Sequence, residues 1–180
     1  MKKSDLLDGR SKKMLHVAPE IQFEKTFSDV LGAGYITADL LNPKVKVKMD
    51  ITDIQYPDAH FDVIYCSHVL EHVPNDRKAM HEFARVLKPD GWAAIMVPYF
   101  PERGGTFEDF SVTDPSERLR LFGQEDHVRI YGNDVVDRLS NAGFEVSVVR
   151  KQDFLSSQEI AQFNLTVHSG DIFLCTKTQV

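Results

Sequence analysis

The segment from Gly123 to Gly132 gathers side chains suited to acid–base and anion-binding chemistry. It reads Gly-Gln-Glu-Asp-His-Val-Arg-Ile-Tyr-Gly. His127 has the side chain whose pKa best suits a general base near neutral pH, and Arg129 can hold an anionic group by two parallel hydrogen bonds. We therefore expect His127 to be a catalytic base, and His127 and Arg129 to contact the substrate. The alternative is that both side chains tie a long loop to the edge of a sheet.

Asp39 and Asp50 each directly follow a short segment predicted to be a strand, 35–38 and 45–49. Asp39 lies 19 positions after Glu20, close to the spacing of about 20 at which nucleotide-binding folds place an acid on the ribose hydroxyls. A carboxylate there can accept a hydrogen bond from each hydroxyl. Asp50 and Ile51 follow the next strand, where Ile51 can cover an adenine face and Asp50 can meet the polar edge of the ring. These residues predict a nucleoside site. The alternative for Asp39 is an exposed acid that caps a loop.

The order His68-Val69-Leu70-Glu71-His72 matches a zinc-peptidase motif. That chemistry needs both histidines on one continuous helix and a further ligand downstream. Here the motif directly follows a buried apolar strand, and Pro74 comes almost immediately after it. We therefore expect a strand-to-helix turn and no metal site, with a zinc hydrolase as the alternative.

Short apolar runs alternate with helical segments along the chain, which is typical of an α/β layered domain. Strands are predicted at 14–18, 35–38, 45–49, 61–66, 92–97, 144–149 and 172–176, and helices at 20–31, 75–87 and 133–141, with a turn at 89–91. Residues 99–131 lose this alternation, and a loop of that length indicates a functional insertion that shapes the substrate pocket. Tyr99 and Phe100 are predicted to form an apolar wall of that pocket, with core packing as the alternative. Ligands of open parallel sheets bind at the carboxyl ends of the strands, where the acids above are expected.

Composition narrows the class of protein. The chain has 180 residues, 42% of them apolar, which suits one domain over 1–180. No apolar run approaches the roughly 20 residues of a membrane helix. Two cysteines suit a reducing cytoplasm, and a net charge of −6 argues against a nucleic-acid surface. We expect a cytoplasmic protein with a small-molecule partner, and neither nucleic acid nor membrane as a partner.

The stretch from Asp50 to Val97 resembles the middle of a class I S-adenosylmethionine-dependent methyltransferase of the type 11 group. The resemblance rests on Phe61-Asp62-Val63-Ile64, on Ser67-His68-Val69-Leu70-Glu71-His72-Val73 and on Glu82-Phe83-Ala84-Arg85-Val86-Leu87-Lys88-Pro89-Asp90-Gly91. It implies a Rossmann-like, doubly wound sheet of seven strands, mostly parallel with an antiparallel last strand. It also implies S-adenosylmethionine as cofactor and S-adenosylhomocysteine as product. The cofactor-binding residues that it implies are His16, Ala18, Glu20, Asp39, Leu40, Asp50, Ile51, Ser67 and His68.

The loop after the first strand departs from the family's pattern. Leu15-His16-Val17-Ala18-Pro19-Glu20 contains no glycine where such enzymes usually have a glycine-rich loop, and Pro19 donates no backbone hydrogen bond. Ala18 is small enough for a close approach, and we expect Glu20 to meet the ammonium group of the cofactor. Only about a dozen residues precede the first strand, so a second copy or a partner is expected to close the pocket in place of the usual lid helix.

The leading hypothesis is methyl transfer from S-adenosylmethionine to an oxygen or nitrogen atom of a small molecule. A catalytically silent module that binds a protein partner or forms an oligomer is one alternative. Another is a different reaction of the same cofactor, such as a cyclisation, because fold alone does not fix chemistry.

Overall fold

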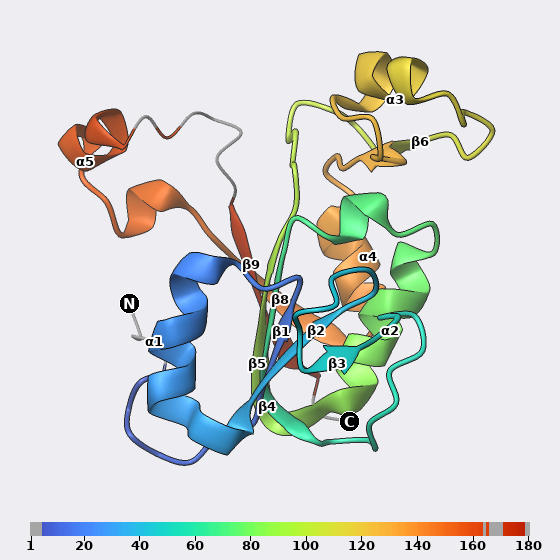
Figure 1. Ribbon diagram of the computed structural model, residues 1–180. Helices are drawn as coiled ribbons and strands as arrows, with labels where there is room; N and C mark the ends of the chain where they lie inside the picture. Colours follow the sequence, from blue (N-terminus) through green and yellow to red (C-terminus); the bar gives the residue numbers. More distant parts are fainter. Residues whose placement is uncertain (1–4, 164, 166–170, 179–180) are drawn as a thin grey trace.

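The computed structural model describes residues 5–163, 165 and 171–178, and its centre is a seven-stranded sheet with helices on both faces (Figure 1). The strand order is β3-β2-β1-β4-β5-β9-β8. The first five of these strands pair in parallel, and β9 is antiparallel to both β5 and β8. The predicted fold, a mostly parallel doubly wound sheet with an antiparallel last strand, is therefore confirmed. The strands are β1 (Met14–Val17), β2 (Tyr35–Asp39), β3 (Val47–Lys48), β4 (Phe61–Ser67), β5 (Leu87–Met96), β8 (Phe144–Val149) and β9 (Ile172–Lys177).

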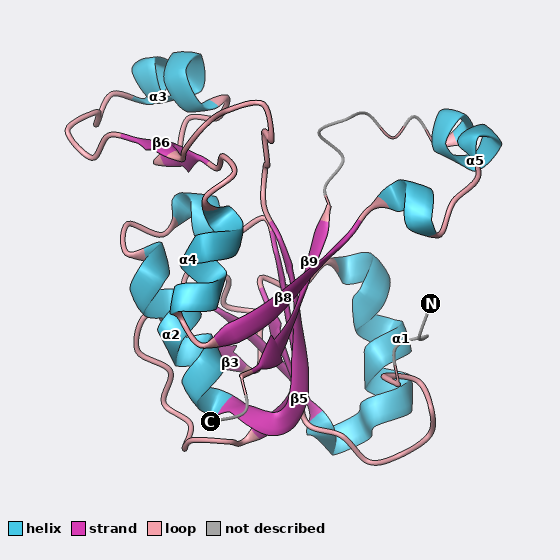
Figure 2. Cartoon of the chain, turned by 180° about the vertical axis from the view of Figure 1, so that it is seen from behind, coloured by secondary structure: helices cyan, strands magenta, loops and turns pink. Residues whose placement is uncertain are grey.

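The central strands are nearly continuous apolar runs because helices cover both of their faces. On β4, Val63 packs toward one face and Ile64 toward the other, and neither is exposed. The helix α1 (Ile21–Leu31) covers the first face through Phe27 and Leu31. On the second face lie α2 (Asp76–Val86) and α4 (Val135–Asn141), which Figure 2 shows on the side of the sheet opposite α1. This arrangement leaves the carboxyl ends of β1, β2 and β4 free to hold a site.

The segment between β5 and α4 forms a small unit of its own beyond the carboxyl edge of the sheet (Figure 1). It contains β6 (Phe107–Glu108), α3 (Pro115–Phe122) and β7 (Arg129–Ile130), with β6 and β7 paired antiparallel. Tyr99 and Tyr131 form a parallel bridge at its base, so the two ends of the insertion meet. The remaining short elements are η1 (Gly32–Gly34), η2 (Leu70–His72), η3 (Lys151–Asp153) and α5 (Ser157–Gln162).

The predicted turn at 89–91 is wrong, because these residues belong to β5, which begins at Leu87 rather than Trp92. The pairing of β4 with β5 shifts register here, between Phe61 and Val63. A Cβ atom on Gly91 would lie 2.8 Å from the backbone oxygen of Asp62, so glycine permits the close approach of the two strands. The glycine thus serves close strand packing and not a turn.

No helix in the described part of the chain is long and apolar enough to cross a membrane.

Candidate functional site

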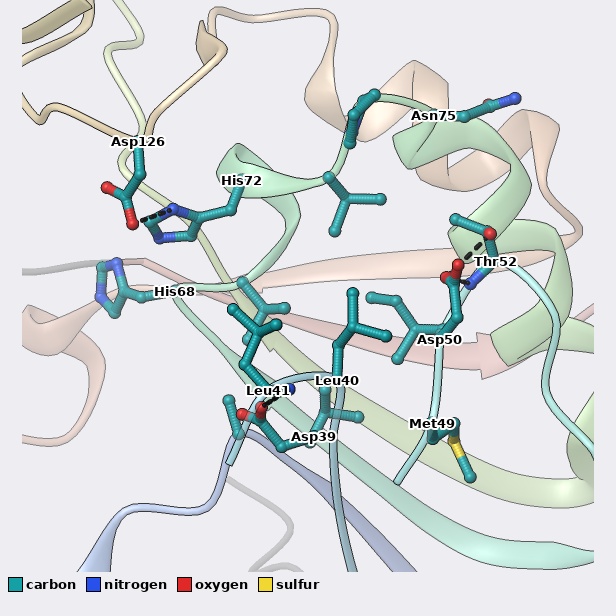
Figure 3. Close-up of a pocket in the computed structure, with 16 residues that line it drawn as sticks. Asp39, Leu40, Leu41, Met49, Asp50, Thr52, His68, His72, Asn75 and Asp126 are labelled. Atoms are coloured by element: carbon teal, nitrogen blue, oxygen red, sulfur yellow. Dashed lines mark hydrogen bonds and ion pairs between the residues drawn. The ribbon is translucent and has the colours of Figure 1, made fainter. Parts of the chain in front are cut away.

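A cavity of about 660 Å³ lies at the carboxyl ends of β1 to β4 (Figure 3). Its volume is in the range of small-molecule sites, about 300–1,000 Å³. Much of its wall is apolar, and its polar lining residues include Asp39 and Asp50 on one side and His68, His72 and Asp126 on another. The lining residues are Val17, Ala18, Asp39, Leu40, Leu41, Met49, Asp50, Ile51, Thr52, His68, Val69, His72, Val73, Pro74, Asn75 and Asp126.

Asp39 ends β2 and holds its carboxylate in a fixed orientation. Its Oδ1 atom accepts hydrogen bonds from the backbone N–H groups of Leu41, at 2.7 Å, and Asn42, at 2.8 Å. No described residue donates a hydrogen bond to the second oxygen, Oδ2. The carboxylate therefore keeps one oxygen available for a ligand, while the other fixes the turn that follows the strand.

Asp50 lies just after β3 and is held in the same way. Its Oδ1 accepts hydrogen bonds from the backbone N–H and the hydroxyl of Thr52, both at 2.8 Å. Met49 donates its backbone N–H to the backbone oxygen of Asp39 at 3.0 Å, which keeps the two strand ends side by side. Leu40 and Ile51 line the cavity as well, so this wall combines two carboxylates with apolar side chains. Figure 3 shows Leu40 between Asp39 and Asp50.

Ala18 lines the cavity directly after β1 and has a φ of 47°. This left-handed conformation is one that glycine adopts freely and alanine does not. The backbone N–H of Ala18 donates to the backbone oxygen of Ala38 at 2.8 Å, which holds the loop against β2. The loop thus has the backbone shape of a glycine turn although it contains no glycine.

His16 and Glu20 do not line the cavity, although both were predicted to bind cofactor. His16 is fully buried, with Nδ1 2.8 Å from the hydroxyl of Tyr35 and Nε2 2.7 Å from Oε2 of Glu20. Burial lowers the pKa of His16 despite the Glu20 carboxylate, so the ring is neutral at neutral pH. Because a carboxylate only accepts, Nε2 donates to Glu20 and Nδ1 accepts from Tyr35. The structure therefore makes His16 a positioning residue for Glu20, whose side chain is 25% exposed.

Of the two residues predicted at the end of β4, His68 lines the cavity and Ser67 does not. His68 has a φ of 54°, a strained conformation of the kind found at binding sites. Its Nδ1 lies 3.3 Å from Oε1 of Glu71, and this hydrogen bond raises the pKa of His68.

His72 and Asp126 also line the cavity, and sequence reasoning did not assign either to the site. Nδ1 of His72 lies 3.2 Å from Oδ2 of Asp126 (Figure 3). Asp126 directly precedes His127, so the sequence segment predicted to contact the substrate already contained it. The pairing itself joins the turn after β4 to the insertion, and sequence spacing does not reveal it.

His127 lies behind His72, not on the cavity wall, and its side chain is 8% exposed. The two imidazole rings meet edge to face with their centroids 4.7 Å apart. Nδ1 of His127 donates to the backbone oxygen of Phe122 at 3.2 Å, and burial lowers the pKa of the ring, so it is neutral at neutral pH. A catalytic base must reach the cavity, and His127 does not, because it contacts His72 and does not line the cavity itself.

Arg129 is fully buried and holds the insertion to the turn after β4. Its guanidinium donates to the backbone oxygens of Leu70, Val73 and Pro74 at 2.5–2.9 Å and to Glu108 at 2.9 Å. A group so enclosed has no free face for an anionic substrate. The structure therefore corrects the predicted substrate contact and agrees with the alternative that this residue ties the loop to the sheet.

Tyr99 and Phe100 are not among the residues that line the cavity. Tyr99 packs edge-on against Phe173, with ring centroids 5.4 Å apart, and its hydroxyl donates to Asn133 at 3.2 Å. The backbone N–H of Phe100 donates to the backbone oxygen of Tyr131. The packing alternative therefore holds for Tyr99, and the backbone of Phe100 helps to close the base of the insertion.

The zinc-peptidase pattern at His68–His72 is not formed. His68 follows a strand in a left-handed conformation, and His72 ends the short turn η2. The two histidines therefore do not share one face of a helix as that chemistry requires.

Part of the chain resembles known methyltransferases in sequence. Residues 11–95 match a family model described as a methyltransferase domain. The uncharacterized methyltransferase YcgJ of Bacillus subtilis is 43% identical over 49 residues, which cover 27% of this chain and 19% of that protein. The sequence match therefore spans about a fifth of the length of this curated relative.

Solved structures resemble the chain over nearly its whole length. The YcgJ structure has a TM-score of 0.61 at 18% identity, covering 94% of this chain and 93% of that one. The complex of the Haloferax volcanii Trm112 methyltransferase activator with a methyltransferase gives 0.63 at 13% identity, covering 94% and 84%. A Burkholderia thailandensis 1,6-didemethyltoxoflavin-N1-methyltransferase with bound S-adenosylhomocysteine gives 0.61 at 15% identity, covering 97% and 75%. At these identities the likeness establishes the fold.

Proposed function

We propose that the protein transfers a methyl group from S-adenosylmethionine to an oxygen or nitrogen atom of a small molecule. Residues 11–95 match the family model of a methyltransferase domain, and the chain has the fold of solved methyltransferases. The observation that carries the proposal is the Asp39 carboxylate, which has one oxygen fixed by two backbone N–H groups and the other available beside the cavity.

The donor set of the cavity fits an adenosyl group. Asp39 can accept hydrogen bonds from the ribose hydroxyls. Leu40 and Ile51 offer apolar contact to the two faces of the adenine, and Asp50 stands near its polar edge. The cavity volume of about 660 Å³ leaves room for the amino-acid part of the cofactor as well.

The loop after β1 is the proposed site for the amino-acid part. Ala18 lines the cavity in the conformation that brings its backbone close to a ligand. Glu20 lies two residues further on, beside the cavity lining and not in it, and its carboxylate is oriented by a hydrogen bond from His16. We assign Glu20 to the cofactor's ammonium group, because a carboxylate so fixed forms a charge-assisted hydrogen bond with little loss of side-chain entropy.

The acceptor side of the site is proposed to lie at the opposite end of the cavity. His68, His72 and Asp126 gather there (Figure 3). Asp126 comes from the insertion at 99–131, which supports a role for that insertion in shaping the acceptor pocket. When bound, S-adenosylmethionine supplies a methyl group on a positively charged sulfur. The main task of the protein is then to align the acceptor atom and exclude water.

The bases available at this end are imidazoles. The structure favours His72 over the predicted His127, because His72 lines the cavity and its Nδ1 faces the carboxylate of Asp126. A base so placed contributes about 10²–10⁴-fold, and only for acceptors that must lose a proton.

The direct test is calorimetric titration of the wild-type chain with S-adenosylmethionine and S-adenosylhomocysteine. We expect saturable binding of one ligand per chain. No binding at millimolar ligand would overturn the proposal. Mass spectrometry of nucleosides retained through purification is an independent check that needs no knowledge of the acceptor.

A binding module that works through a partner is the second function we consider, and exposed apolar residues near the cavity favour it. Leu41, on the cavity wall, is 86% exposed, and Leu40, on the same wall, is 50% exposed. A structural neighbour was solved together with its Trm112 activator. A partner or a second copy of this chain that covers these residues would close the pocket in place of a lid helix. Size-exclusion chromatography with and without S-adenosylhomocysteine separates this case, because a silent module assembles but binds no nucleoside.

A further inference from the structure

Three side chains with metal-ligating atoms converge beside the cavity. Glu71, His72 and His127 each offer one such atom, and these atoms lie within 4.8 Å of one another. We call them the Glu–His–His cluster. Glu71 and His72 come from the turn η2 and His127 from the insertion, so the fold brings together residues far apart in the sequence. A hydrogen bond of 3.0 Å from the backbone N–H of Val128 to the backbone oxygen of Glu71 holds the two segments together.

The Glu71 carboxylate has an unsatisfied oxygen. Glu71 is 1% exposed, and no described residue forms a hydrogen bond with its Oε2. Its other oxygen is 3.3 Å from Nδ1 of His68. A buried carboxylate oxygen without a partner is costly, and buried charges in proteins are normally paired or coordinate metals. A cation or a hydrogen-bond donor from outside the described residues would satisfy this oxygen.

Both histidines of the cluster are held in the manner of metal-ligating histidines. Nδ1 of His127 donates to the backbone oxygen of Phe122, and Nδ1 of His72 faces the carboxylate of Asp126. Neither oxygen can donate, so each Nδ1 carries the proton, and the lone pair of a neutral ring lies on Nε2. Metal-bound histidines commonly have such a carboxylate or carbonyl on the second ring nitrogen, where it fixes the tautomer and ring orientation.

We propose that Glu71, His72 and His127 bind a divalent transition-metal ion of the zinc type. Two imidazoles and one carboxylate are the protein ligands of many catalytic zinc sites, in which a fourth position stays open. His72 lines the cavity, so this open position faces the proposed acceptor site. Ligands about 2.0–2.2 Å from zinc lie about 3.4 Å from one another. The cluster reaches that spacing through side-chain shifts on the order of an ångström. His72, at 29% side-chain exposure, has more room for them than the buried Glu71 and His127. A bound ion occupies the Nε2 lone pair of His72, so His72 is a ligand in the metal-bound protein and can act as a base only in the metal-free protein. Metal binding itself does not require methyl-transfer activity.

The test uses the full chain, freed of metal by a chelator and then titrated with ZnCl₂ in competition with a chromophoric chelator. We expect one tightly bound zinc per chain and a rise in the thermal unfolding midpoint on zinc addition, because the ion binds the folded state. Asp126→Asn removes the partner of a proposed ligand and should weaken zinc binding about 10–100-fold. Glu71→Gln and His72→Gln should weaken it further. Because the side chain of His72 is partly exposed, its variant is expected to fold even if the buried Glu71 variant does not.

The matched control is His81→Gln, which removes an exposed histidine from α2. It should bind zinc as tightly as wild type. Failure of the wild type to bind zinc, or equal affinity in wild type and His72→Gln, would overturn the proposal. Titration of the metal-free protein with S-adenosylhomocysteine reports separately on the proposed function, so the two can fail independently.

Discussion

Nδ1 of His72 lies 3.2 Å from Oδ2 of Asp126, which joins the turn after β4 to the insertion at one end of the cavity (Figure 3). The cavity therefore has two differently built ends. Asp39 and Asp50 end strands of the parallel sheet, whereas the opposite end needs the insertion to be docked. The contacts between the insertion and the turn after β4 therefore determine whether the His72–Asp126 end of the cavity forms.

Arg129 is the residue on which this docking depends most. Arg129→Met removes the donor to three backbone oxygens of the turn after β4 and leaves Glu108 without one of its two arginine partners. We expect the free energy of unfolding to fall by about 3–5 kcal/mol, since a buried charge network is broken. Urea denaturation measures this. Arg120→Met, on the exposed face of α3, is the control and should leave the midpoint unchanged. An Arg129 variant as stable as this control would contradict the assigned role.

The strained loop after β1 predicts opposite outcomes for two substitutions at Ala18. Glycine adopts the φ of 47° freely, so Ala18→Gly should keep the affinity for S-adenosylhomocysteine. Its stability should change little, because relief of about 1–2 kcal/mol of strain is offset by greater freedom of the unfolded chain. A β-branched residue tolerates this φ poorly, so Ala18→Val should lose stability and ligand affinity. Calorimetry and urea denaturation measure both. Equal behaviour of the two variants would show that the loop conformation does not matter.

Glu20 is assigned to the ammonium group of the cofactor, and ligands with and without that group test the assignment. Glu20→Gln keeps the size of the side chain but removes its charge. We expect about tenfold weaker binding of S-adenosylhomocysteine, equivalent to about 1.4 kcal/mol, which is within the range of a charge-assisted hydrogen bond. Binding of methylthioadenosine, which lacks the amino-acid part, should not change. Equal loss for both ligands would point to general damage of the pocket.

Buried His16 makes the stability of the fold depend on pH. Burial lowers its pKa from the ordinary value of 6.5. As the pH falls below about 6.5 the unfolded chain gains a proton at this residue, while the folded chain gains it only at lower pH. The free energy of unfolding should therefore fall with the pH in this range. His16→Gln, which does not titrate, should show a smaller fall between about pH 7.5 and 5.5 in urea denaturation. An unchanged pH dependence would mean that His16 does not contribute to it.

The sequence was informative where local patterns determine structure. The apolar run at Phe61–Cys66 predicted a central strand, and the position of Asp39 predicted an acid at the cavity. Helix α3 escaped prediction although it has local signals: Asp114 accepts a hydrogen bond from the N–H of Glu117, Pro115 begins the helix, and Gly123 ends it with a φ of 85°.

Contacts between distant segments could not be predicted from the sequence. The pattern at Gly123–Gly132 singled out a segment from which Asp126 lines the cavity, but the roles of its members depend on which side of the insertion faces the sheet. The structure turns Arg129 inward and places Asp126 on the cavity wall. The prediction that Arg129 contacts the substrate rested on residue type, and residue type does not reveal that this side chain is buried.

Binding of S-adenosylhomocysteine to wild type, Asp39→Ala and Asp29→Ala tests the central claim most directly. Asp29 is an exposed acid on α1 that pairs only with Lys25 among the described residues, so its variant is the matched control. If the free oxygen of Asp39 holds the ribose, Asp39→Ala should bind at least about tenfold more weakly than wild type, while Asp29→Ala should bind equally well. Equal affinity of all three proteins, or no binding by any of them at millimolar ligand, would contradict the account.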